Sequence, residues 1–370
     1  MAITYNKGEW SELYAFIKLL KEGKIYNADE NANRINDLYL PIIKIIREEP
    51  PGNKVDYFTG ETIKIFENGR EVKIISVSEC EKYVKLLFPK IFSGAKGSEL
   101  KGAFSIPEME TFMDDFNITK VKASSTEKVD IEMQIHDVHT GYSPEVGFSI
   151  KSDVGSPPTL LNAGKNTRMR YKIVGLSNED MQIINSIDKS VCKEYMKARI
   201  EKLKELSSAI QYDGMLDATF EDNLVMIDSS LPRIYGELVL LHYLHIGEKI
   251  YDCNILTDML TAQNPIEYRR ADIYKHKFKK LISASALGMT PGKPWDGLDT
   301  ATGGYIIIKK DGDVLCYHLY NRNYFEEYLL NNTSFDRPSA TRHDYGYVYE
   351  LNGEKYIDLN VQIRFKSIKD

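Results

Sequence analysis

Hydrophobic residues recur at helical spacing in several stretches of this chain and alternate with polar residues in others. In residues 8–22 the apolar side chains of Trp10, Leu13, Ile17 and Leu20 fall three or four positions apart, which is typical of a helix with one buried face. Periodicity and helix-start signals predict further helices at 79–92, 105–116, 178–187, 190–210, 232–246, 254–262 and 266–284.

Strand patterns occur in four places. Residues 38 to 75 form alternating runs separated by the turn sequences PPGN, FTGE and ENGR. A hairpin is predicted within 128–153, and two more have turns at 310–313 (Lys-Asp-Gly-Asp) and 352–353 (Asn-Gly). These elements predict a mixed α/β (α+β) fold with a central mixed sheet flanked by helices and with N-terminal and C-terminal α+β elaborations.

The order of these elements predicts three consecutive regions. Residues 1–95 form an N-terminal helix and strand-rich region. Residues 96–287 form the core that contains the 128–153 hairpin, followed by a helical region. Residues 288–370 form a strand-rich C-terminal region, which begins with GMTPGKPWDG, a linker candidate because its glycines and prolines oppose regular structure.

Composition narrows the class of protein. The chain has 370 residues, of which 42% are hydrophobic, enough to bury a substantial core. No stretch approaches 18 apolar residues, so a membrane span is not expected. The first residues lack a signal-peptide layout, which makes a cytoplasmic location the expectation. The four cysteines are far apart in the sequence and are expected to be isolated thiols.

The formal charge of −6 does not by itself indicate a nucleic-acid-binding protein, but the positive charge is unevenly distributed. The segment KNTRMRYK at 165–172 is locally basic, and so is YRRADIYKHKFKK at 268–280. A phosphate backbone responds to such local basic surface rather than to net charge. The alternative for each segment is a solvated polar face.

The hairpin within 128–153 has one polar and one apolar face. If its turn is centred on Thr140-Gly141, Asp130 faces Lys151 and Glu132 faces Ser149 across the strands. The intervening positions on both strands are aliphatic or aromatic and form the opposite face. Because a slip of one residue would bury Asp130 and Lys151 among them, we expect the polar face to be well specified.

An aspartate beside a lysine matches the needs of phosphodiester hydrolysis. Asp130 can anchor Mg²⁺, which favours oxygen ligands, and Lys151 can orient a water or stabilise charge on a phosphate. Two strands with this pattern resemble the active-site hairpin of the PD-(D/E)XK nuclease superfamily, with Ser149 where an acid is usual. We expect Glu132, or else Glu108 (or its neighbour Glu110), to complete the metal site and Ser149 to support metal-bound solvent.

Two alternatives to this assignment are open. Asp137 competes with Asp130 as the first acid, although its parity places it on the apolar side unless a bulge shifts the register. The hairpin can also be a surface element whose charges form ordinary ion pairs across the strands.

Three long phrases resemble the HpaII family of Type II restriction endonucleases. They are FSIKSDVGSPPTLLNAGKNTRMRY at 148–171, YNKGEWSELYAFIKLLKEGKIYNAD at 5–29 and RPSATRHDYGYVYELNGEKYIDLNVQIRF at 337–365. The resemblance implies Mg²⁺-dependent cleavage of double-stranded DNA at a short palindrome, with CCGG as the family's namesake target. It also implies a partner methyltransferase that protects the host, and Ser149 belongs to the family phrase FSIKS.

Several polar residues outside the hairpin are candidates for contacts with DNA. Arginine matches the acceptor pair of guanine in the major groove, and lysine is the more typical phosphate contact. The candidates are Asn162, Lys165, Asn166, Arg168, Arg170, Arg269, Arg270, Lys277, Arg337, Arg342 and His343. A palindromic target favours a two-fold homodimer, with a monomer that nicks sequentially as the alternative. The competing function is a non-catalytic, sequence-specific DNA-binding protein that keeps a nuclease-like fold.

Overall fold

The computed structural model describes residues 3–49, 52–94, 103–121, 129–138, 140–154, 157–248 and 251–366. The chain forms two compact units, each built from two segments. Unit 1 is Met1–Pro158 with Asp299–Tyr328, and unit 2 is Thr159–Leu298 with Leu329–Asp370. The three consecutive regions predicted from sequence stay a prediction, and their boundary at 95/96 lies outside the described residues.

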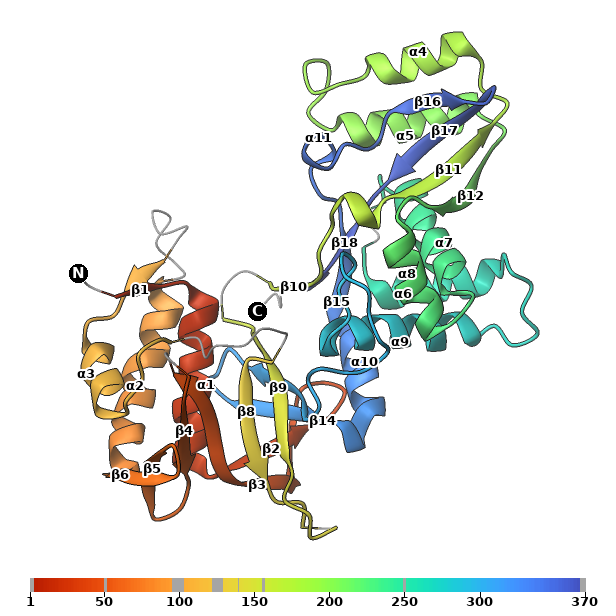
Figure 1. Cartoon of the computed structure of the whole chain (residues 1–370). Coiled ribbons are helices and arrows are strands. Elements are labelled where there is room, and N and C mark those ends of the chain that lie inside the picture. The colour runs from red at the N-terminus through yellow and green to blue at the C-terminus, as the bar shows by residue number, and fades with distance from the viewer. Residues whose placement is uncertain are drawn as a thin grey trace. The chain divides into compact units, whose positions relative to one another are not determined.

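Unit 1 is built around a mixed sheet of nine strands (Figure 1). The strands β9 and β13 run parallel, as do β14 and β2, and the other pairs are antiparallel. In sheet order they are β2 (Lys24–Ala28), β14 (Val314–His318), β13 (Gly304–Ile308), β9 (Glu145–Ser152), β8 (Ile131–Ile135), β3 (Arg34–Glu49), β4 (Asn53–Phe58), β5 (Thr62–Glu67) and β6 (Arg70–Ser76).

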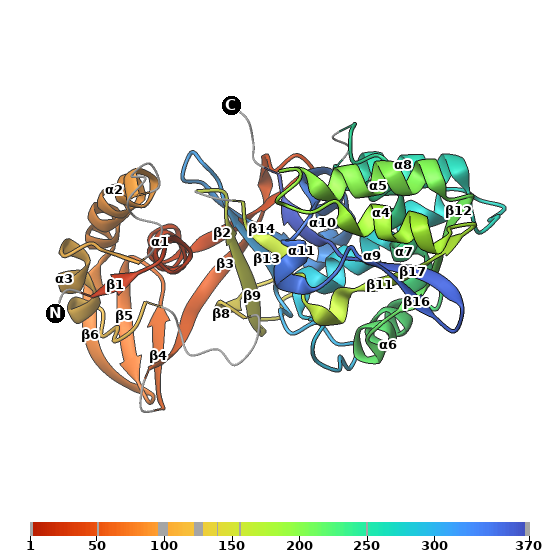
Figure 2. The ribbon, with the colours of Figure 1, turned by 90° about the horizontal axis from the view of Figure 1, so that it is seen from above.

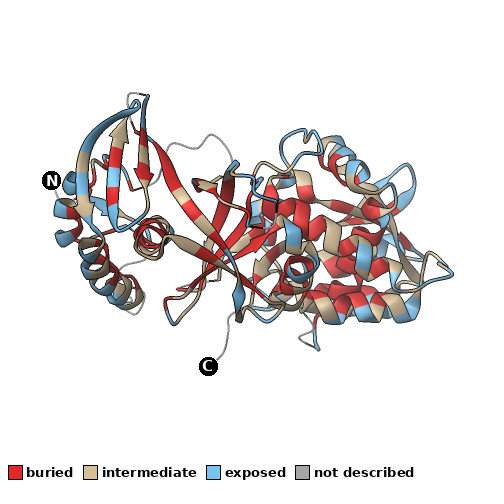
Figure 3. Ribbon diagram, turned by 90° about the horizontal axis from the view of Figure 1, so that it is seen from below, coloured by how far each residue is buried: buried red, intermediate tan, exposed pale blue. Residues whose placement is uncertain are grey.

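Three helices of unit 1 pack on one face of this sheet (Figure 2). They are α1 (Lys7–Glu22), α2 (Val77–Gly94) and α3 (Glu108–Asp115), and a short sheet of β1 (Thr4–Tyr5) and β7 (Phe104–Ser105) lies beside them. Helix α1 begins with a capping box at Asn6 and ends at Gly23, whose φ of 60° is left-handed. Its apolar side chains join those of the sheet in one buried core. Figure 3 colours the buried residues of both units red.

The opposite face of the sheet carries an aromatic cluster. Tyr305 of β13 and Tyr317 of β14 pack against Phe325 and Tyr328 of helix α10 (Arg322–Asn332). Tyr317 and Tyr328 stack with their ring centroids 4.7 Å apart. Strands β13 and β14, in which every residue is buried, are therefore covered on both faces, as is usual for strands with parallel neighbours.

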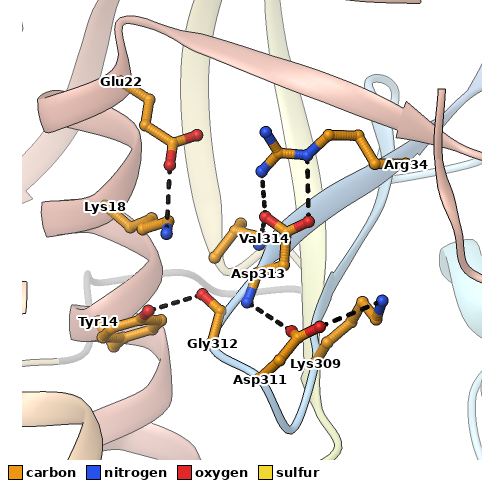
Figure 4. A network of polar contacts seen from close by, with 9 residues as sticks. All are labelled: Tyr14, Lys18, Glu22, Arg34, Lys309, Asp311, Gly312, Asp313 and Val314. Carbon is orange, nitrogen blue, oxygen red and sulfur yellow. Dashed lines mark hydrogen bonds and ion pairs between the residues drawn. The ribbon is translucent and has the colours of Figure 1, made fainter. Parts of the chain in front are cut away.

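The turn between β13 and β14 is tied to neighbouring elements by polar contacts (Figure 4). Tyr14 of α1 donates a hydrogen bond of 2.6 Å to the carbonyl of Gly312. Asp313 pairs with the guanidinium of Arg34 and accepts from the amide of Val314. Gly312 has a φ of 85°, so glycine is needed at this position of the turn.

Unit 2 contains two further sheets and most of the helices. The four-stranded sheet is β12 (Ala209–Met215), β11 (Met169–Val174), β17 (Glu354–Leu359) and β16 (Val348–Leu351), and the three-stranded sheet is β10 (Thr159–Leu161), β18 (Gln362–Phe365) and β15 (Thr333–Asp336). The helices are α4 (Asn178–Ser186), α5 (Tyr195–Leu206), α6 (Ala218–Ile227), α7 (Leu231–Leu244), α8 (Cys253–Gln263), α9 (Ile273–Leu287) and the short α11 (Ala340–His343).

Most predicted elements are present, and the predicted mixed α+β class with a central mixed sheet is confirmed. The hairpin turns at 310–313 and 352–353 lie where they were predicted, whereas Pro50 and Pro51 of the PPGN turn lie outside the described residues. Several elements were not predicted, among them the strands β2, β10, β11, β12 and β15 and the helices α6 and α10. None of the helices in the described ranges is long and apolar enough to cross a membrane.

Candidate functional site

The polar hairpin is formed by β8 and β9, but its strands pair in a different register from the predicted one. Glu132 lies opposite Gly147 rather than Ser149, so the predicted register is wrong by two residues. The reason is the turn, which is closed between Asp137 and Tyr142 by a 2.9 Å backbone hydrogen bond and is therefore centred one residue earlier. Because side chains alternate between the two faces of a strand, a register shift of two residues leaves each side chain on its predicted face. The apolar face of the hairpin lies in the core as predicted.

The new register places Asp130 beside Ser149 at the start of β8. The Asp130 amide donates to the carbonyl of Phe148 at 2.9 Å, which continues the ladder by one residue. Its carboxylate Oδ2 then accepts from the Ile150 amide at 2.7 Å and from the Ser149 hydroxyl at 3.3 Å. The carboxylate thus accepts from a backbone amide of β9 just before β8 begins. This contact with β9 fixes the position of the carboxylate.

Lys151 completes this cluster. Its Nζ lies 4.0 Å from Asp130 Oδ2, and its side chain is 33% exposed while that of Asp130 is 11% exposed. Ser149 between them is buried. The structure therefore brings together Asp130, Ser149 and Lys151, three of the four predicted catalytic residues, on one face of the sheet.

Two residues that sequence reasoning missed lie near this cluster. Asp153 continues the strand beyond β9, with its amide donating to the carbonyl of Ile308 at 2.9 Å. Burial raises the pKa of Asp153 to about 6, although Lys310 and Lys309 oppose the shift. Tyr305 is the neighbour of Ser149 on β13. Burial raises the pKa of Tyr305 well above its usual value, and the charges of Tyr328, Asp153 and Asp130 add to the shift.

The alternation of residues along β9 could have identified Asp153 from the sequence. Residues 149, 151 and 153 alternate with the aliphatic residues of β9, so they share a face if the strand continues. A half-buried carboxyl group with a raised pKa beside a charged cluster is typical of a group that exchanges a proton.

The other predicted acids are not gathered at Asp130. Glu132 is exposed and lies two positions along β8 on the same face. Glu108 belongs to α3, which packs on the opposite face, and forms an ion pair with Lys90 that lowers its pKa. Asp137 closes the far end of the hairpin. The predicted cross-strand replacement of the missing acid by Glu132 therefore has no support in the register.

The donor set at Asp130 suits a hard cation with few protein ligands. Among the described residues there is no group of three or more histidine, cysteine or acidic side chains that could hold a metal ion. Within the same ranges, Asp130 Oδ1 makes no hydrogen bond or ion pair, whereas Oδ2 takes three contacts. Mg²⁺ commonly binds one or two carboxylates and keeps waters or substrate phosphates as its other ligands, so the residues present fit this ion.

All the candidates for DNA contacts lie in unit 2. Arg170 of β11 donates to the hydroxyl of Tyr349 at 2.9 Å, and that hydroxyl donates to Asp358 at 2.8 Å. Arg168 donates to the carbonyl of Asp344 at 2.8 Å. Both arginines are half-buried and already have partners, so each is held in one orientation by its neighbours.

The basic segment at 268–280 is partly neutralised by acids of unit 2. Arg270 is exposed and pairs with Asp272 at 2.6 Å. Lys277 pairs with Asp228 at 2.8 Å, and this contact raises the lysine pKa although burial opposes it. Arg269 is exposed. Helix α9 therefore presents less uncompensated positive charge than its sequence indicates.

The remaining candidates lie on loops and on the short helix α11. Asn162 and Lys165 are exposed, and Asn166 is half-buried beside Gly292. Arg342 is exposed on α11 and His343 is half-buried at its end. Burial and the charge of Arg342 lower the pKa of His343. Arg337 precedes α11 and has a buried guanidinium nitrogen, NH1, without a hydrogen-bond partner in the described part of the chain.

The chain is similar to known proteins over nearly its whole length. A family model described as HpaII restriction endonuclease matches residues 6–365. Among curated proteins, the Type II restriction enzyme HpaII of Haemophilus parainfluenzae is 38% identical over 365 residues, which cover 97% of this chain and 98% of that protein. No solved structure matches the chain. The similarity therefore covers both compact units and the hairpin with Asp130 and Lys151.

Proposed function

Because this chain belongs to the HpaII restriction endonuclease family, we propose that it is a Type II site-specific deoxyribonuclease that cuts double-stranded DNA at a short palindrome, CCGG. Membership of the family makes the chain an endonuclease, a hydrolase that acts on double-stranded DNA. The target sequence, the metal and the residue roles are parts of the proposal. The observation that carries it is the Asp130, Ser149 and Lys151 cluster on one sheet face.

The chemistry follows from the positions of these side chains. Lys151 orients the attacking water, and its positive charge stabilises the negative charge that develops on the phosphate. Ser149 and the Ile150 amide hold the Asp130 carboxylate through Oδ2, so Oδ1 is the oxygen that would bind a ligand. Two strands that position an aspartate and a lysine in this way support a PD-(D/E)XK type of hairpin, with a serine where the second acid is usual.

The proposed cofactor is Mg²⁺. Asp130 would hold it through Oδ1, with water and DNA phosphate as further ligands. Glu132, exposed two positions along β8 on the same face, would contribute less, by a contact through water. When bound, the ion supplies a positive charge that polarises the phosphate and lowers the pKa of bound water.

The proposed setting is a restriction-modification system in the cytoplasm. A nuclease that cuts a four-base-pair sequence would destroy its host's DNA unless those sites are protected, so a partner methyltransferase with the same target is expected. A palindrome has two-fold symmetry, which favours a homodimer with one active site for each strand.

Cleavage of paired duplexes tests this proposal. The purified chain with Mg²⁺ should cut a duplex that contains CCGG and spare one in which these four positions are reordered. Lys151→Ala should lower the rate by about a thousandfold or more, as expected for loss of transition-state charge stabilisation, and should largely spare DNA binding. Lys64→Ala, an exposed lysine on β5, is the matched control and should cut normally.

The same experiment separates the catalytic function from the alternative of a DNA-binding protein without activity. If the wild-type chain binds the CCGG duplex in Mg²⁺ but leaves it intact over long incubation, the alternative holds. If it cuts both duplexes equally, the chain is a nuclease but the proposed target is wrong.

A further inference from the structure

Unit 2 contains a cavity that no proposed role yet uses. Its volume is about 400 Å³, within the size range of small-ligand sites. It is lined by the loop before α5 and the first turn of α5, by the end of α7, and by residues around α11. The side chains that matter for its chemistry are Lys189, Lys193, Glu194, Tyr195, Lys197 and Arg337.

The charge of this cavity is positive. Lys189, Lys193, Lys197 and Arg337 line it, whereas Glu194 is the one acid among the described residues of its lining. Lys197 also pairs with Glu201 at 3.9 Å. Lys193 is exposed and has no ion pair within the described ranges. Although the whole chain has a formal charge of −6, a local excess of cations attracts anions because low-dielectric walls concentrate the field.

Arg337 provides the most specific indication of the ligand. Its NH1 is buried and has no hydrogen-bond partner among the described residues. A guanidinium carries only donors, and a buried donor without a partner is costly. The side chain of Arg337 as a whole is half-buried and lines the cavity, and phosphate matches the geometry of its guanidinium fork.

The backbone at the cavity also favours an anion. Helix α5 begins at Tyr195, and the side chain of Glu194 at its N-cap accepts no capping hydrogen bond. The first amides of a helix have no partner within the helix, and the helix dipole places positive charge at this end. This helix end thus adds to the attraction exerted by the lysines and Arg337.

The walls of the cavity are held by buried hydrogen bonds. Arg199 of α5 is fully buried and donates to the carbonyls of Ile187 and Gly346, at 2.6 and 2.9 Å. Tyr345 donates to the carbonyl of Pro338 at 2.6 Å. These contacts fix the backbone on both sides of the cavity, at the start of the loop before α5 and beside Arg337, before a ligand arrives.

We infer that this cavity binds a phosphate ester, and that its source is the backbone of bound DNA. Arg337 then acts as a phosphate contact and not as a base reader. This deepens the proposed function, since it assigns a sequence-independent contact to an enzyme that acts on DNA. The second source of the same chemistry is a free nucleotide or inorganic phosphate.

Substitutions on two walls of the cavity test this inference. Arg337→Gln removes the positive charge at position 337, and Arg337→Lys keeps it. Lys193→Gln removes the charge of an exposed lysine in the lining, where little effect on folding is expected. Lys202→Gln is the matched control, because Lys202 lies on the same helix and pairs with Glu205 outside the cavity. Affinity for the CCGG duplex and for the reordered duplex is measured in EDTA at several salt concentrations, and thermal melting checks that each variant is folded.

A phosphate contact predicts equal losses on both duplexes. Arg337→Gln should weaken each by about tenfold and reduce the slope of log affinity against log salt by about 0.9. Lys193→Gln should reduce both in the same direction. Arg337→Lys keeps the charge without the fork and should lose less affinity than Arg337→Gln, by the same factor on both duplexes, and Lys202→Gln should behave as wild type. A loss confined to the CCGG duplex, shared by Arg337→Lys, would overturn the inference in favour of base reading.

Calorimetry with inorganic phosphate and with deoxycytidine monophosphate distinguishes the two sources. If Arg337→Gln and Lys193→Gln leave DNA affinity unchanged but abolish binding of these probes, the phosphate site stands with a free ligand as its source. If neither DNA nor the probes respond to the variants, no phosphate site exists. These outcomes are independent of the proposed function, since that proposal fails when wild-type protein does not distinguish or cut the CCGG duplex.

Discussion

At the scale of single residues, the environment of Asp130 explains how one carboxylate can serve a hydrolytic site. Three donors or cations contact Oδ2, namely the Ser149 hydroxyl, the Ile150 amide and Lys151. Hydrogen bonds to a charged acceptor fix its orientation more strongly than neutral ones. The serine at position 149 thus braces the first acid and does not replace the second.

Substitution of Asp130 and Glu132 should have very different effects. Asp130→Asn retains an oxygen that can accept from the Ile150 amide but loses the charge at the cluster, so we expect at least a hundredfold loss of cleavage with little change in folding. Glu132 is exposed and faces Gly147, and Glu132→Gln should change the rate less than about threefold. Initial rates against Mg²⁺ concentration measure both effects, because loss of a carboxylate that binds the metal lowers the metal-dependent rate.

The outcome that contradicts this ranking is specific. If Glu132→Gln raises the Mg²⁺ concentration needed for half-maximal activity as much as Asp130→Asn does, then Glu132 is a metal ligand of equal weight despite the register.

The raised pKa of Asp153 predicts a dependence of stability on pH. The folded pKa of about 6 exceeds the ordinary value of 3.8, so between these values the folded state binds more protons than the unfolded state. Stability therefore falls as pH rises through this window. A difference of about two pKa units corresponds to about 3 kcal/mol.

Urea denaturation in EDTA at pH 4 and pH 7.5 checks this prediction against Asp153→Asn, which cannot ionise. Relative to that variant, the wild type should lose roughly 2–3 kcal/mol of unfolding free energy between the two pH values. Parallel pH profiles for the two proteins would show that Asp153 has no raised pKa.

At the scale of elements, turn chemistry was the most reliable guide. The turn at 352–353 has φ values of 52° for Asn352 and 81° for Gly353, the left-handed pair that an Asn-Gly hairpin requires. The turn at 310–313 was recognised in the same way, from its glycine and flanking aspartates. Such turns are local, so residue types at a few positions decide them.

The contacts of the β13–β14 turn predict different roles for its two aspartates. Asp313 pairs with Arg34 in a half-buried position, whereas the side chain of Asp311 is 62% exposed and pairs with Lys309. Asp313→Asn should cost about 1–2 kcal/mol of unfolding free energy in unit 1. Asp311→Asn, the matched control in the same turn, should cost less than about 0.5 kcal/mol.

Urea unfolding followed by circular dichroism measures both variants. Equal costs would indicate that the turn is stabilised by its own backbone and not by the contact with Arg34.

Longer-range features of the elements were predicted less well, for identifiable reasons. The period of two along β8 and β9 predicted which residues share a face, including Asp130 and Lys151, but register depends on the turn, and the closure at Asp137 was not evident from sequence. Strand β11 was not predicted, because its segment stood out only as locally basic, with Arg170 and Lys172 on the strand and Arg168 just before it. Its pairing with β17, some 180 residues away, provides the strand's stability and is not local.

The residues of the candidate site could be predicted only where the strands that carry them could be predicted. Asp130, Ser149 and Lys151 follow from strand parity and residue chemistry. Asp153 follows only if β9 is known to continue past Ser152, and the cavity beside Arg337 requires segments near positions 190, 246 and 340 to come together. Sequence patterns do not specify such contacts between distant segments.

At the scale of the whole molecule, the candidates divide between the two compact units. Asp130, Ser149, Lys151 and Asp153 belong to unit 1, and every candidate for DNA contacts belongs to unit 2. The sequence crosses from one unit to the other at 158/159, 298/299 and 328/329. Each unit is therefore made of segments distant in sequence, and neither is a continuous domain that could be cut out by truncation.

The two tryptophans provide one reporter for each unit. Trp10 is buried in unit 1, and Trp295 lies in unit 2 with its indole donating to the carbonyl of Leu298 at 2.9 Å. In a Lys151→Ala background, Trp295→Phe leaves Trp10 as the reporter and Trp10→Phe leaves Trp295. Because ligand binding stabilises the part of the native state that holds the ligand, DNA should raise the unfolding free energy reported by Trp295.

Free CCGG duplex at a hundred times its dissociation constant should raise the unfolding free energy reported by Trp295 by about 2.7 kcal/mol. The unfolding free energy reported by Trp10 should rise by no more than this. Fluorescence-detected urea unfolding with and without duplex measures both shifts, and the reordered duplex at the same concentration is the control, with a smaller effect. A shift of the Trp10 transition with none in the Trp295 transition would place the DNA contacts in unit 1. The assignment of Arg337 and the other unit 2 residues to DNA binding would then have to be abandoned, because bound duplex cannot stabilise unit 1 alone through contacts that unit 2 makes.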